Sequence, residues 1–320
     1  MAVENDDGDT YSEDFFLRLG FEALGDLTHG RSQRTAQIVI FKNNYGASPS
    51  TVSSVWADLV GPLLGQDRVD KMTNPVYLLV MYKWLKSYST ESELKTAFGG
   101  MAVKTIRYWC GFFVKRVAKL RVEKIDKHWN NTGGLLLGRT VDGIHYLIKE
   151  PRPFSKTMSS HKHGGKSSLM YEFVVATDKP RLLWLNGPFP AGIGDQRVYA
   201  EKGLKAAIEK IQMENNSPEF RIIADSGYYK LAALDTLAFR NEFDPREIEW
   251  FKDRALSRHE SYNRLTKVYN ILDTKFRHDR SSDNPHYDFP NHKAVVETIC
   301  VTIQYALDAG EVTLLDPYPS

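Results

Sequence analysis

Three features are scarce in this chain of 320 residues, and each scarcity excludes a class of protein. Its two cysteines, Cys110 and Cys300, sit inside apolar stretches, which argues against a disulfide scaffold and favours a reducing compartment. No apolar run approaches the ~18 residues of a membrane span, and the best one, Val76–Tyr82, ends at Lys83. The first fourteen residues hold six acids and no lysine or arginine, whereas a secretory signal needs a basic start and an apolar stretch. We therefore expect neither a membrane span nor a signal peptide.

Composition and charge indicate a globular protein with an uneven distribution of basic residues. Hydrophobic residues make up 42% and charged residues 26%, and the length fits one large or two modest domains. The net charge is +2, but without the six N-terminal acids 42 basic residues face 34 acidic ones, a net +8. Residues Met101–Asn130 hold eight lysines and arginines against two acids. Such a stretch favours a polyanionic partner or, equally, a solvated helix face.

The first part of the chain is helical in pattern, with two candidate helix-turn-helix units. Thr35–Asn44 and Thr51–Leu64 predict two helices joined by a short turn. Glu91–Phe98 and a longer helix from Ala102 repeat this shape, and the longer helix has an apolar stripe with basic residues elsewhere. A packing module without DNA contacts is the alternative, although an exposed basic helix favours nucleic acid. The predicted DNA contacts are Lys104, Arg107, Lys115 and Lys119, and which helix enters a groove stays open.

From about Leu135 the pattern changes to strands. The predicted strands are Leu135–Leu137, Thr140–Ile148, Leu169–Ala176, Arg181–Leu185 and Phe220–Ala224. The predicted helices are Tyr199–Met213, Pro245–His278 and Lys293–Ala309, while Tyr229–Arg240 is ambiguous between a helix and a short strand. This order predicts a mixed α/β layer fold. With Gly133-Gly134 as the boundary, we expect a disordered acidic tail (1–14), a helical DNA-binding domain (15–132), an α/β domain (133–315) and a short tail (316–320).

Three acidic residues stand out by their positions. Asp142 interrupts an otherwise apolar strand, where a carboxylate facing the core costs several kcal/mol unless it is paired or metal-bound. Asp225 directly follows the strand Phe220–Ala224, at the carboxyl end where ligands of open α/β sheets gather. Glu260 lies on a helix, off the apolar stripe that includes Tyr269, so it is free to point into a site. Taken singly, each acid is more typical of a capped turn or a surface position.

Taken together, the three segments follow the pattern of a known family. They are Thr140–Ile148, the turn Ala224-Asp225-Ser226-Gly227-Tyr228 and the helix Arg258–Leu265, with Asp225 and Glu260 35 positions apart. Over about Arg139–Leu315 the chain resembles the DDE transposases of the PIF/Harbinger type, also described as the DDE superfamily endonuclease domain. The stretch Gly187–Arg197 is similar to a further stretch of that family, whose Asp is Asp195 here. The helical N-terminal half resembles, more loosely, the family's helix-turn-helix region.

The resemblance implies a fold, a reaction and a set of partners. Residues 133–315 would form a ribonuclease-H-like nuclease domain, a mixed sheet with flanking helices. In such a domain Asp142, Asp225 and Glu260 would be catalytic and would hold two divalent ions, Mg²⁺ or Mn²⁺, with Asp195 secondary. The implied reaction is cleavage of double-stranded DNA at transposon ends and joining to an A/T-rich target. Implied partners are a second copy of the chain on DNA and a Myb-like DNA-binding protein, with a location in the nucleus.

Two departures and several alternatives accompany this reading. The family usually has glycine at the position of Ala224 and often a small polar residue at that of Ile144, but neither change removes a carboxylate. Arg264 and Lys267, beside Glu260, are predicted DNA-backbone contacts or, equally, a solvated helix face. A domesticated protein that binds DNA without cutting it is the first alternative function. A DNA-binding regulator whose α/β half is an interaction scaffold is the second.

Overall fold

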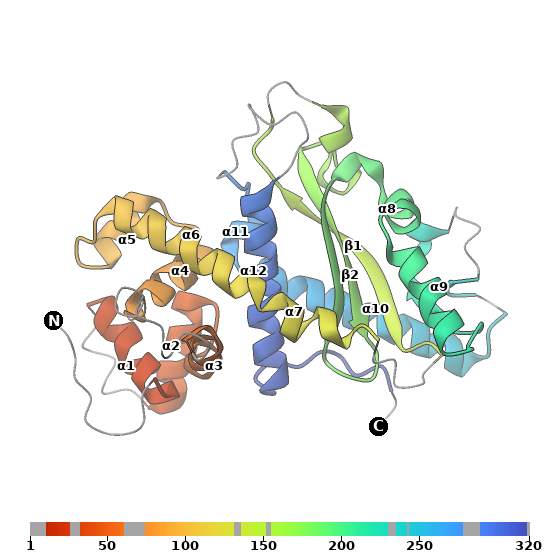
Figure 1. Ribbon diagram of the computed structural model, residues 1–320, viewed down its shortest axis with the longest axis horizontal. Coiled ribbons are helices and arrows are strands. Elements are labelled where there is room, and N and C mark those ends of the chain that lie inside the picture. Colours follow the sequence, from red (N-terminus) through yellow and green to blue (C-terminus); the bar gives the residue numbers. More distant parts are fainter. Residues whose placement is uncertain are drawn as a thin grey trace.

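We analysed a computed structural model of the protein. It describes residues 11–25, 33–60, 74–130, 136–151, 155–229, 235–241, 243–277 and 289–318. The first half of the chain is helical, and the second half combines a sheet with helices (Figure 1). The predicted change of pattern after residue 130 is therefore confirmed, although the expected boundary at residues 133 and 134 lies outside the described residues.

The helical half contains seven α-helices among the described residues. They are α1 (Glu13–Ala23), α2 (Arg34–Tyr45), α3 (Pro49–Val60), α4 (Val76–Ser87), α5 (Glu91–Ala97), α6 (Val103–Lys119) and α7 (Arg121–Lys124), followed by the 3₁₀ turn η4 (Asp126–His128). The four helices predicted in the two helix-turn-helix units are confirmed as α2, α3, α5 and α6. Thr90 begins α5 with a capping box, in which its hydroxyl and the carboxylate of Glu93 satisfy each other's backbone N–H groups.

The predicted acidic tail overlaps the first helix. Residues 1–10 of that tail lie outside the described residues, but α1 already begins at Glu13. The Ser12 hydroxyl caps the helix by accepting from the backbone N–H of Phe15, and the two acids of the first turn suit the positive end of the helix dipole. The ring of Tyr11 also lies 5.5 Å from that of Trp56, so the ordered chain starts before residue 14.

The second half is built on a five-stranded mixed sheet in the order β3-β2-β1-β4-β5. The strands are β1 (Arg139–Leu147), β2 (Ser168–Ala176), β3 (Leu182–Pro190), β4 (Ile222–Ala224) and β5 (Leu237–Ala238). β1 pairs antiparallel with β2, and β2 antiparallel with β3, whereas β4 runs parallel to both β1 and β5. The predicted α/β class with a mixed sheet and flanking helices is thereby confirmed.

Several predicted boundaries need correction. Leu136 and Leu137 form a turn rather than a strand, because their carbonyls accept single hydrogen bonds from Arg221 and Thr177 instead of joining a ladder. The helix predicted over Tyr199–Met213 is two helices, α8 (Asp195–Glu201) and α9 (Leu204–Glu214), because Gly203 adopts a left-handed φ of 105° between them. The ambiguous segment supplies the short strand β5, and the stretch predicted over Pro245–His278 is α10 (Arg246–Lys267) and α11 (Asn270–Asp273).

Helices cover both faces of the sheet. Val141, Val174 and Ala224 point to one face, where they share a buried cluster with residues of α8 and α9. The other face packs against α10, α11 and α12 (Pro290–Asp308), and Figure 1 shows α12 standing between the sheet and the helical half. None of the described helices combines the length and the hydropathy needed to cross a bilayer.

The helical half and the sheet share one hydrophobic core. A single buried cluster runs from Phe16 in α1 through α4 and α6 to α12 and on to the inner face of β1 and β2. Thirteen consecutive or near-consecutive positions of α12 are buried, which is typical of a helix enclosed by protein on all sides. The segments expected as separate domains, 15–132 and 133–315, are therefore packed as one body around α12.

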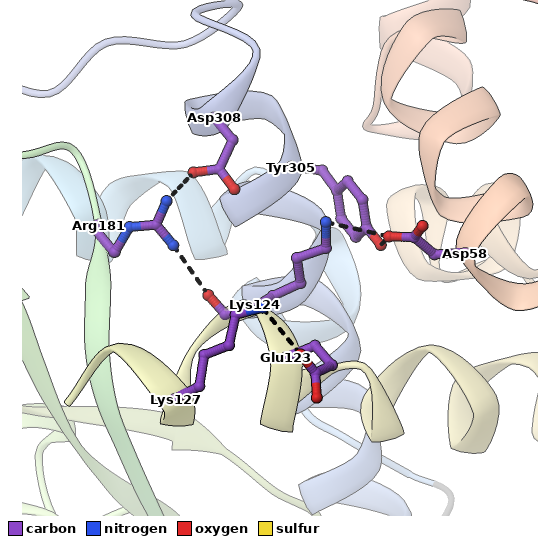
Figure 2. Close-up of polar contacts among 7 residues, drawn as sticks. All are labelled: Asp58, Glu123, Lys124, Lys127, Arg181, Tyr305 and Asp308. Carbon is purple, nitrogen blue, oxygen red and sulfur yellow. Dashed lines mark hydrogen bonds and ion pairs between the residues drawn. The ribbon is translucent and has the colours of Figure 1, made fainter. Parts of the chain in front are cut away.

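Polar contacts close the outer edge of this junction. Asp58 at the end of α3 lies 3.1 Å from the Lys124 ammonium and accepts a hydrogen bond from the hydroxyl of Tyr305 in α12. The Lys124 ammonium also lies 4.0 Å above the Tyr305 ring. Arg181, between β2 and β3, pairs with Asp308 at 2.7 Å and donates to the carbonyl of Lys124 (Figure 2). One network thus ties α3, α7, α12 and the sheet together.

Candidate carboxylate site

Strand register brings the first two predicted acids together. Val141 of β1 pairs with Ala224 of the parallel strand β4, so the next residues, Asp142 and Asp225, stand at neighbouring positions. Val141 and Ala224 point into the cluster under α8 and α9, and side chains alternate along a strand. Asp142 therefore faces the other side, toward α10, where Asp225 follows the last residue of β4. The predicted positions, Asp142 within a strand and Asp225 directly after one, are confirmed.

Glu260 reaches the same place from α10. A cavity of about 250 Å³ is lined by Asp142, Asp225 and Glu260. Its other lining residues are Ser226, Arg240, Asp253, Leu256, Ser257 and His259. α10 crosses β1 and β4. Its side chains Tyr262 and Thr266 are buried against the sheet, and Glu260 is exposed. The structure thus brings all three predicted acids to one cavity.

Hydrogen bonds fix the two strand acids. The Asp142 Oδ2 atom accepts a hydrogen bond of 2.9 Å from the side-chain amide of Asn263, one turn beyond Glu260 on α10. The Asp225 Oδ1 atom accepts one of 2.9 Å from the backbone N–H of Gly227, at the start of the 3₁₀ turn η8 (Ser226–Tyr228). Both carboxylates keep an oxygen free of these contacts. They are oriented but still able to bind a further group.

A fourth carboxylate, Asp195, enters from the opposite face of the sheet. It begins α8, its side chain is 8% exposed, and its Oδ1 atom is buried without a hydrogen-bond partner among the described residues. It fits because residue 143 is glycine: a Cβ atom there would lie 2.0 Å from Asp195 Oδ1. Its other oxygen lies 3.4 Å from the Cβ position of Gly227. Asp195 therefore fills the gap between the two glycines that follow the strand acids.

A lysine that sequence reasoning did not single out sits among these acids. The ammonium of Lys162 lies 3.9 Å from Asp142 Oδ1 and 3.7 Å from Asp195 Oδ2. It donates a hydrogen bond of 2.8 Å to the carbonyl of Gly143. Lys162 lies in the 3₁₀ turn η6 (His161–His163), 20 positions beyond Asp142 in the connection from β1 to β2. A surface loop rich in lysine and histidine carries no signal in the sequence that would place this one side chain in a site.

The electrostatics of the site are those of crowded negative charge. Burial, and then the charge of Asp142, raise the pKa of Asp225. Burial raises the pKa of Asp195 as well, with further contributions from Asp142 and Asp225 and an opposing one from Lys162. Carboxylates that raise one another's pKa are relieved by a nearby cation. A bound cation would therefore stabilise the ionised form of these carboxylates.

Two buried histidines support the site without lining up as ligands. His259, next to Glu260, has its Nδ1 atom 2.8 Å from the hydroxyl oxygen of Thr140, and burial lowers its pKa to about 4. His145, predicted as a packing residue, is buried with its Nδ1 atom 2.6 Å from the Ser160 hydroxyl. Burial lowers its pKa to about 3. His259 therefore holds α10 on β1 as a neutral ring, and His145 holds the Lys162 loop in the same way.

The residues that line the cavity suit a hard divalent cation in kind. Oxygen ligands from carboxylates are those that Mg²⁺ and Mn²⁺ prefer. Among the described residues, no three acid, histidine or cysteine side chains lie close enough to hold one ion in their present positions. The three acids that line one cavity are the residues that would hold such a cation.

The basic residues predicted to contact DNA lie in two places. Lys104, Arg107, Lys115 and Lys119 are all exposed on α6. Arg107 is held by a bidentate pair with Glu91 of α5, at 2.8 and 2.7 Å. The exposed residues of the other candidate reader, α3, are Ser54, Ala57 and Asp58, without a basic side chain. Between the two helix-turn-helix units, the charge favours α5 and α6.

Arg264 and Lys267 lie beside the carboxylate cavity. They line a second cavity of about 450 Å³ together with Ser261, Asn263 and Leu315. Ser257 and Glu260 line both cavities, so the two adjoin along α10. The sequence reading that Arg264 and Lys267 share a face with Glu260 is confirmed by this arrangement.

Comparison of the chain with protein-family models, with curated proteins and with solved structures gave no match. The site is therefore interpreted from its own residues and their geometry.

Proposed function

We propose that this protein is a metal-dependent DNA endonuclease of the transposase type, with Asp142, Asp225 and Glu260 as its metal-holding, catalytic residues. The observation that supports this most is that these three acids, from β1, β4 and α10, line one cavity. They are 83 and 35 positions apart in the chain, so only the fold brings them together. Asp195 is the fourth carboxylate of the site and lies behind Gly143.

The sheet supports a ribonuclease-H-like core for this activity. Three antiparallel strands are followed in space by two parallel ones, in the order β3-β2-β1-β4-β5. The first acid lies on the central strand β1 and the second at the end of its parallel neighbour β4. The third lies on a helix that crosses both strands. This is the placement that the resemblance to DDE transposases implies.

The residues of the chain have separable roles in the reaction. When bound, two divalent ions would polarise the scissile phosphate and activate a water or a 3′-hydroxyl for in-line displacement. Asp142 and Asp225 would hold the ions at the sheet, and Asn263 and the N–H of Gly227 orient these two carboxylates. Glu260 closes the site from α10. No side chain is required as a covalent nucleophile.

The basic surfaces provide a path for the DNA backbone. Arg264 and Lys267 stand in the cavity that adjoins Glu260, where they can neutralise phosphates next to the cleaved bond. The exposed face of α6 adds Lys104, Lys115 and Lys119, and its position after the capped helix α5 suits a groove-reading helix of the helix-turn-helix type. Double-stranded DNA is therefore the proposed substrate.

The test is nicking of labelled duplex DNA in Mn²⁺ by the wild type, by Asp225→Asn and by Glu260→Gln. Each variant keeps the shape of the side chain and removes its charge, so we expect a loss of cleavage of at least 100-fold, which is a barrier increase of about 2.7 kcal/mol. Glu249→Gln, an exposed acid in the first turn of the same helix, is the matched control and should cut like the wild type. Cleavage that survives in both site variants would exclude this assignment.

A DNA-binding protein that does not cut is the competing candidate. The observation in its favour is that, in the described part of the chain, no three ligand side chains approach one position. Titration calorimetry with Mn²⁺ separates the two functions. Metal binding by the wild type that is lost in Asp225→Asn supports the nuclease, whereas DNA binding without any metal binding supports the binder.

A further inference from the structure

Three contacts hold the ammonium of Lys162 beside the strand acid Asp142. The Lys162 side chain is 35% exposed, so it reaches both the acids and solvent. Its hydrogen bond goes to the carbonyl of Gly143, the residue after Asp142, and its nearest charges are Asp142 and Asp195. Exposed ion pairs contribute little to the free energy of folding, so stability alone does not account for the position of Lys162.

The connection between β1 and β2 keeps this lysine in place. The Ser160 hydroxyl is bound to His145 of β1, and the Nε2 atom of His163 lies 3.2 Å from the His145 carbonyl oxygen. These two contacts bracket Lys162 on either side. Met158 is fully buried beneath the loop, and Ser159 and Ser167 form a bridge that closes it. The loop is therefore packed against the sheet, and the backbone of Lys162 has a fixed place above Gly143.

Asp195, the first residue of α8, provides the second carboxylate near Lys162. Its carboxylate is buried, and one of its oxygens has no hydrogen-bond partner among the described residues. A buried carboxylate of this kind is costly unless a cation compensates for it. Lys162 is the cation within 4 Å of it, and Gly143 leaves the space through which the two groups meet. Asp195 is thus placed to hold the lysine rather than to face the cavity.

We propose that Lys162 binds the phosphate group of the DNA at the cleavage site and that Asp195 positions it for this contact. The proposal rests on the proposed function. The four carboxylates and a bound phosphodiester together carry five negative charges, of which two divalent cations would offset four. Lys162 supplies the fifth positive charge next to Asp142, which lines the cavity, and its compact ammonium is suited to a phosphate oxygen.

The test measures DNA affinity, which does not depend on turnover. Binding of a labelled duplex is followed by fluorescence anisotropy in Ca²⁺ over a series of salt concentrations, for the wild type, Lys162→Met and Lys162→Arg. Loss of one phosphate contact should lower the salt slope by about 1 and weaken binding several-fold. Arginine should restore most of both, because it also binds phosphate. Lys210→Met, an exposed lysine of α9 on the other face of the sheet, should leave the slope unchanged.

Mn²⁺ calorimetry without DNA supplies the second measurement. If Lys162 is only a counter-ion that fills a metal position, Lys162→Met will bind Mn²⁺ more tightly while its DNA salt slope stays at the wild-type value. That result overturns the proposal. A reduced slope in Lys162→Met, with Mn²⁺ affinity equal to or above that of the wild type, supports it.

The two proposals fail in different ways. A wild type that neither binds Mn²⁺ nor nicks DNA contradicts the nuclease, but a lower slope in Lys162→Met would still establish the phosphate contact. A wild type that cuts, with Lys162→Met equal to it in cleavage rate and in salt slope, contradicts only the role of Lys162.

Discussion

The consecutive residues Asp142 and Gly143 show how single residues shape this site. Gly143 follows Asp142 in β1 and points to the face of α8, where the Asp195 carboxylate occupies the space that a Cβ atom would fill. Any larger residue at position 143 would displace Asp195 and the Met170 side chain, whose end lies 2.7 Å from the same point. The Asp142-Gly143 pair therefore supplies a carboxylate on one face of the sheet and room for a second carboxylate on the other.

Glu172 is a second buried acid at this point and carries a prediction for pH. It pairs with Gly143 across β1 and β2, it is fully buried, and both carboxyl oxygens lack hydrogen-bond partners in the described structure. Burial, and then the charge of Asp195, raise its pKa to about 8, while the Trp184 indole, near but outside hydrogen-bonding geometry, opposes this. Glu172 is therefore a neutral acid in the folded protein at pH 7.

We expect Glu172→Gln to remove a pH dependence of stability. The folded pKa of about 8 lies above the unfolded value of 4.5, so the stabilisation is complete below pH 4.5 and is lost as the pH rises to 8. The variant keeps the neutral shape, so relative to the wild type it should gain on the order of a few kcal/mol between these limits. Urea unfolding of both proteins at pH 5 and pH 8 measures this gain. If the unfolding free energies of the two proteins differ by the same amount at pH 5 and at pH 8, Glu172 is ionised in the folded state.

At the scale of elements, one helix organises the site. The helix α10 buries Ala255, Tyr262 and Thr266 against the sheet and presents Glu260 and Asn263 to the cavity. Residues three or four positions apart lie on one face of a helix, so the same period carries the basic side chains of Arg264 and Lys267 to the adjoining cavity. A single amphipathic pattern thus places Glu260, its neighbour Asn263 and two basic side chains along one face of the helix.

The helix α6 carries the prediction for DNA affinity at this scale. Lys115 and Lys119 are exposed on its last two turns and form no ion pair with an acid among the described residues, so both are available to phosphates. We expect Lys115→Ala with Lys119→Ala to lower the salt slope of duplex binding by about 2 and to leave the fold intact. Fluorescence anisotropy across a salt series gives the slope. The matched control is the pair Lys205→Ala and Lys210→Ala on α9. Equal slopes for the wild type and the α6 variant would exclude this face from DNA binding.

At the scale of the whole molecule, α12 joins the helical half of the chain to the half that contains the sheet. Its side chains pack on α3, α6 and α7 on one side and on β3 and α10 on the other. The Thr298 hydroxyl donates to the carbonyl of Val114 in α6, and the Thr302 hydroxyl lies 3.2 Å from that of Tyr82 in α4. Together with the network around Lys124 (Figure 2), these contacts make the helical half and the sheet one packing unit.

This shared core predicts that damage in the helical half weakens the sheet. Leu79 of α4 is fully buried, and Leu79→Ala should destabilise the protein by about 2 to 5 kcal/mol through lost burial and a cavity. Because the core is continuous, amide hydrogen exchange in β1 and β2 should accelerate in step with exchange in α4 and α6. Ala57→Gly, on the exposed side of α3, is the control and should cost about 1 kcal/mol. Acceleration confined to the helices would show that the two halves unfold separately.

Local patterns in the sequence determined most of the helices and strands. Periodicity of 3.6 and of 2 depends on neighbouring residues alone, so α2, α3, α5, α6, β1, β2 and α12 were predictable within a few residues. Asp142, Asp225 and Glu260 were singled out by the order and spacing of three segments that resemble a known family, since each acid by itself is typical of a capped turn or a surface position. The short strands and the split at Gly203 were not predictable, since two or three residues and one turn carry too little periodicity.

Tertiary structure alone decided how the site is completed and how the halves are joined. Asp195 comes from α8 and Lys162 from the connection between β1 and β2, and they meet beside Gly143, which leaves a gap that no local pattern reports. The choice of α6 over α3 as the basic surface depends on which side of each helix packing leaves exposed. The single core depends on α12, whose apolar faces match the helices and the sheet equally well. Contacts between residues far apart in the chain set these features, because burial and charge act through space and not along the sequence.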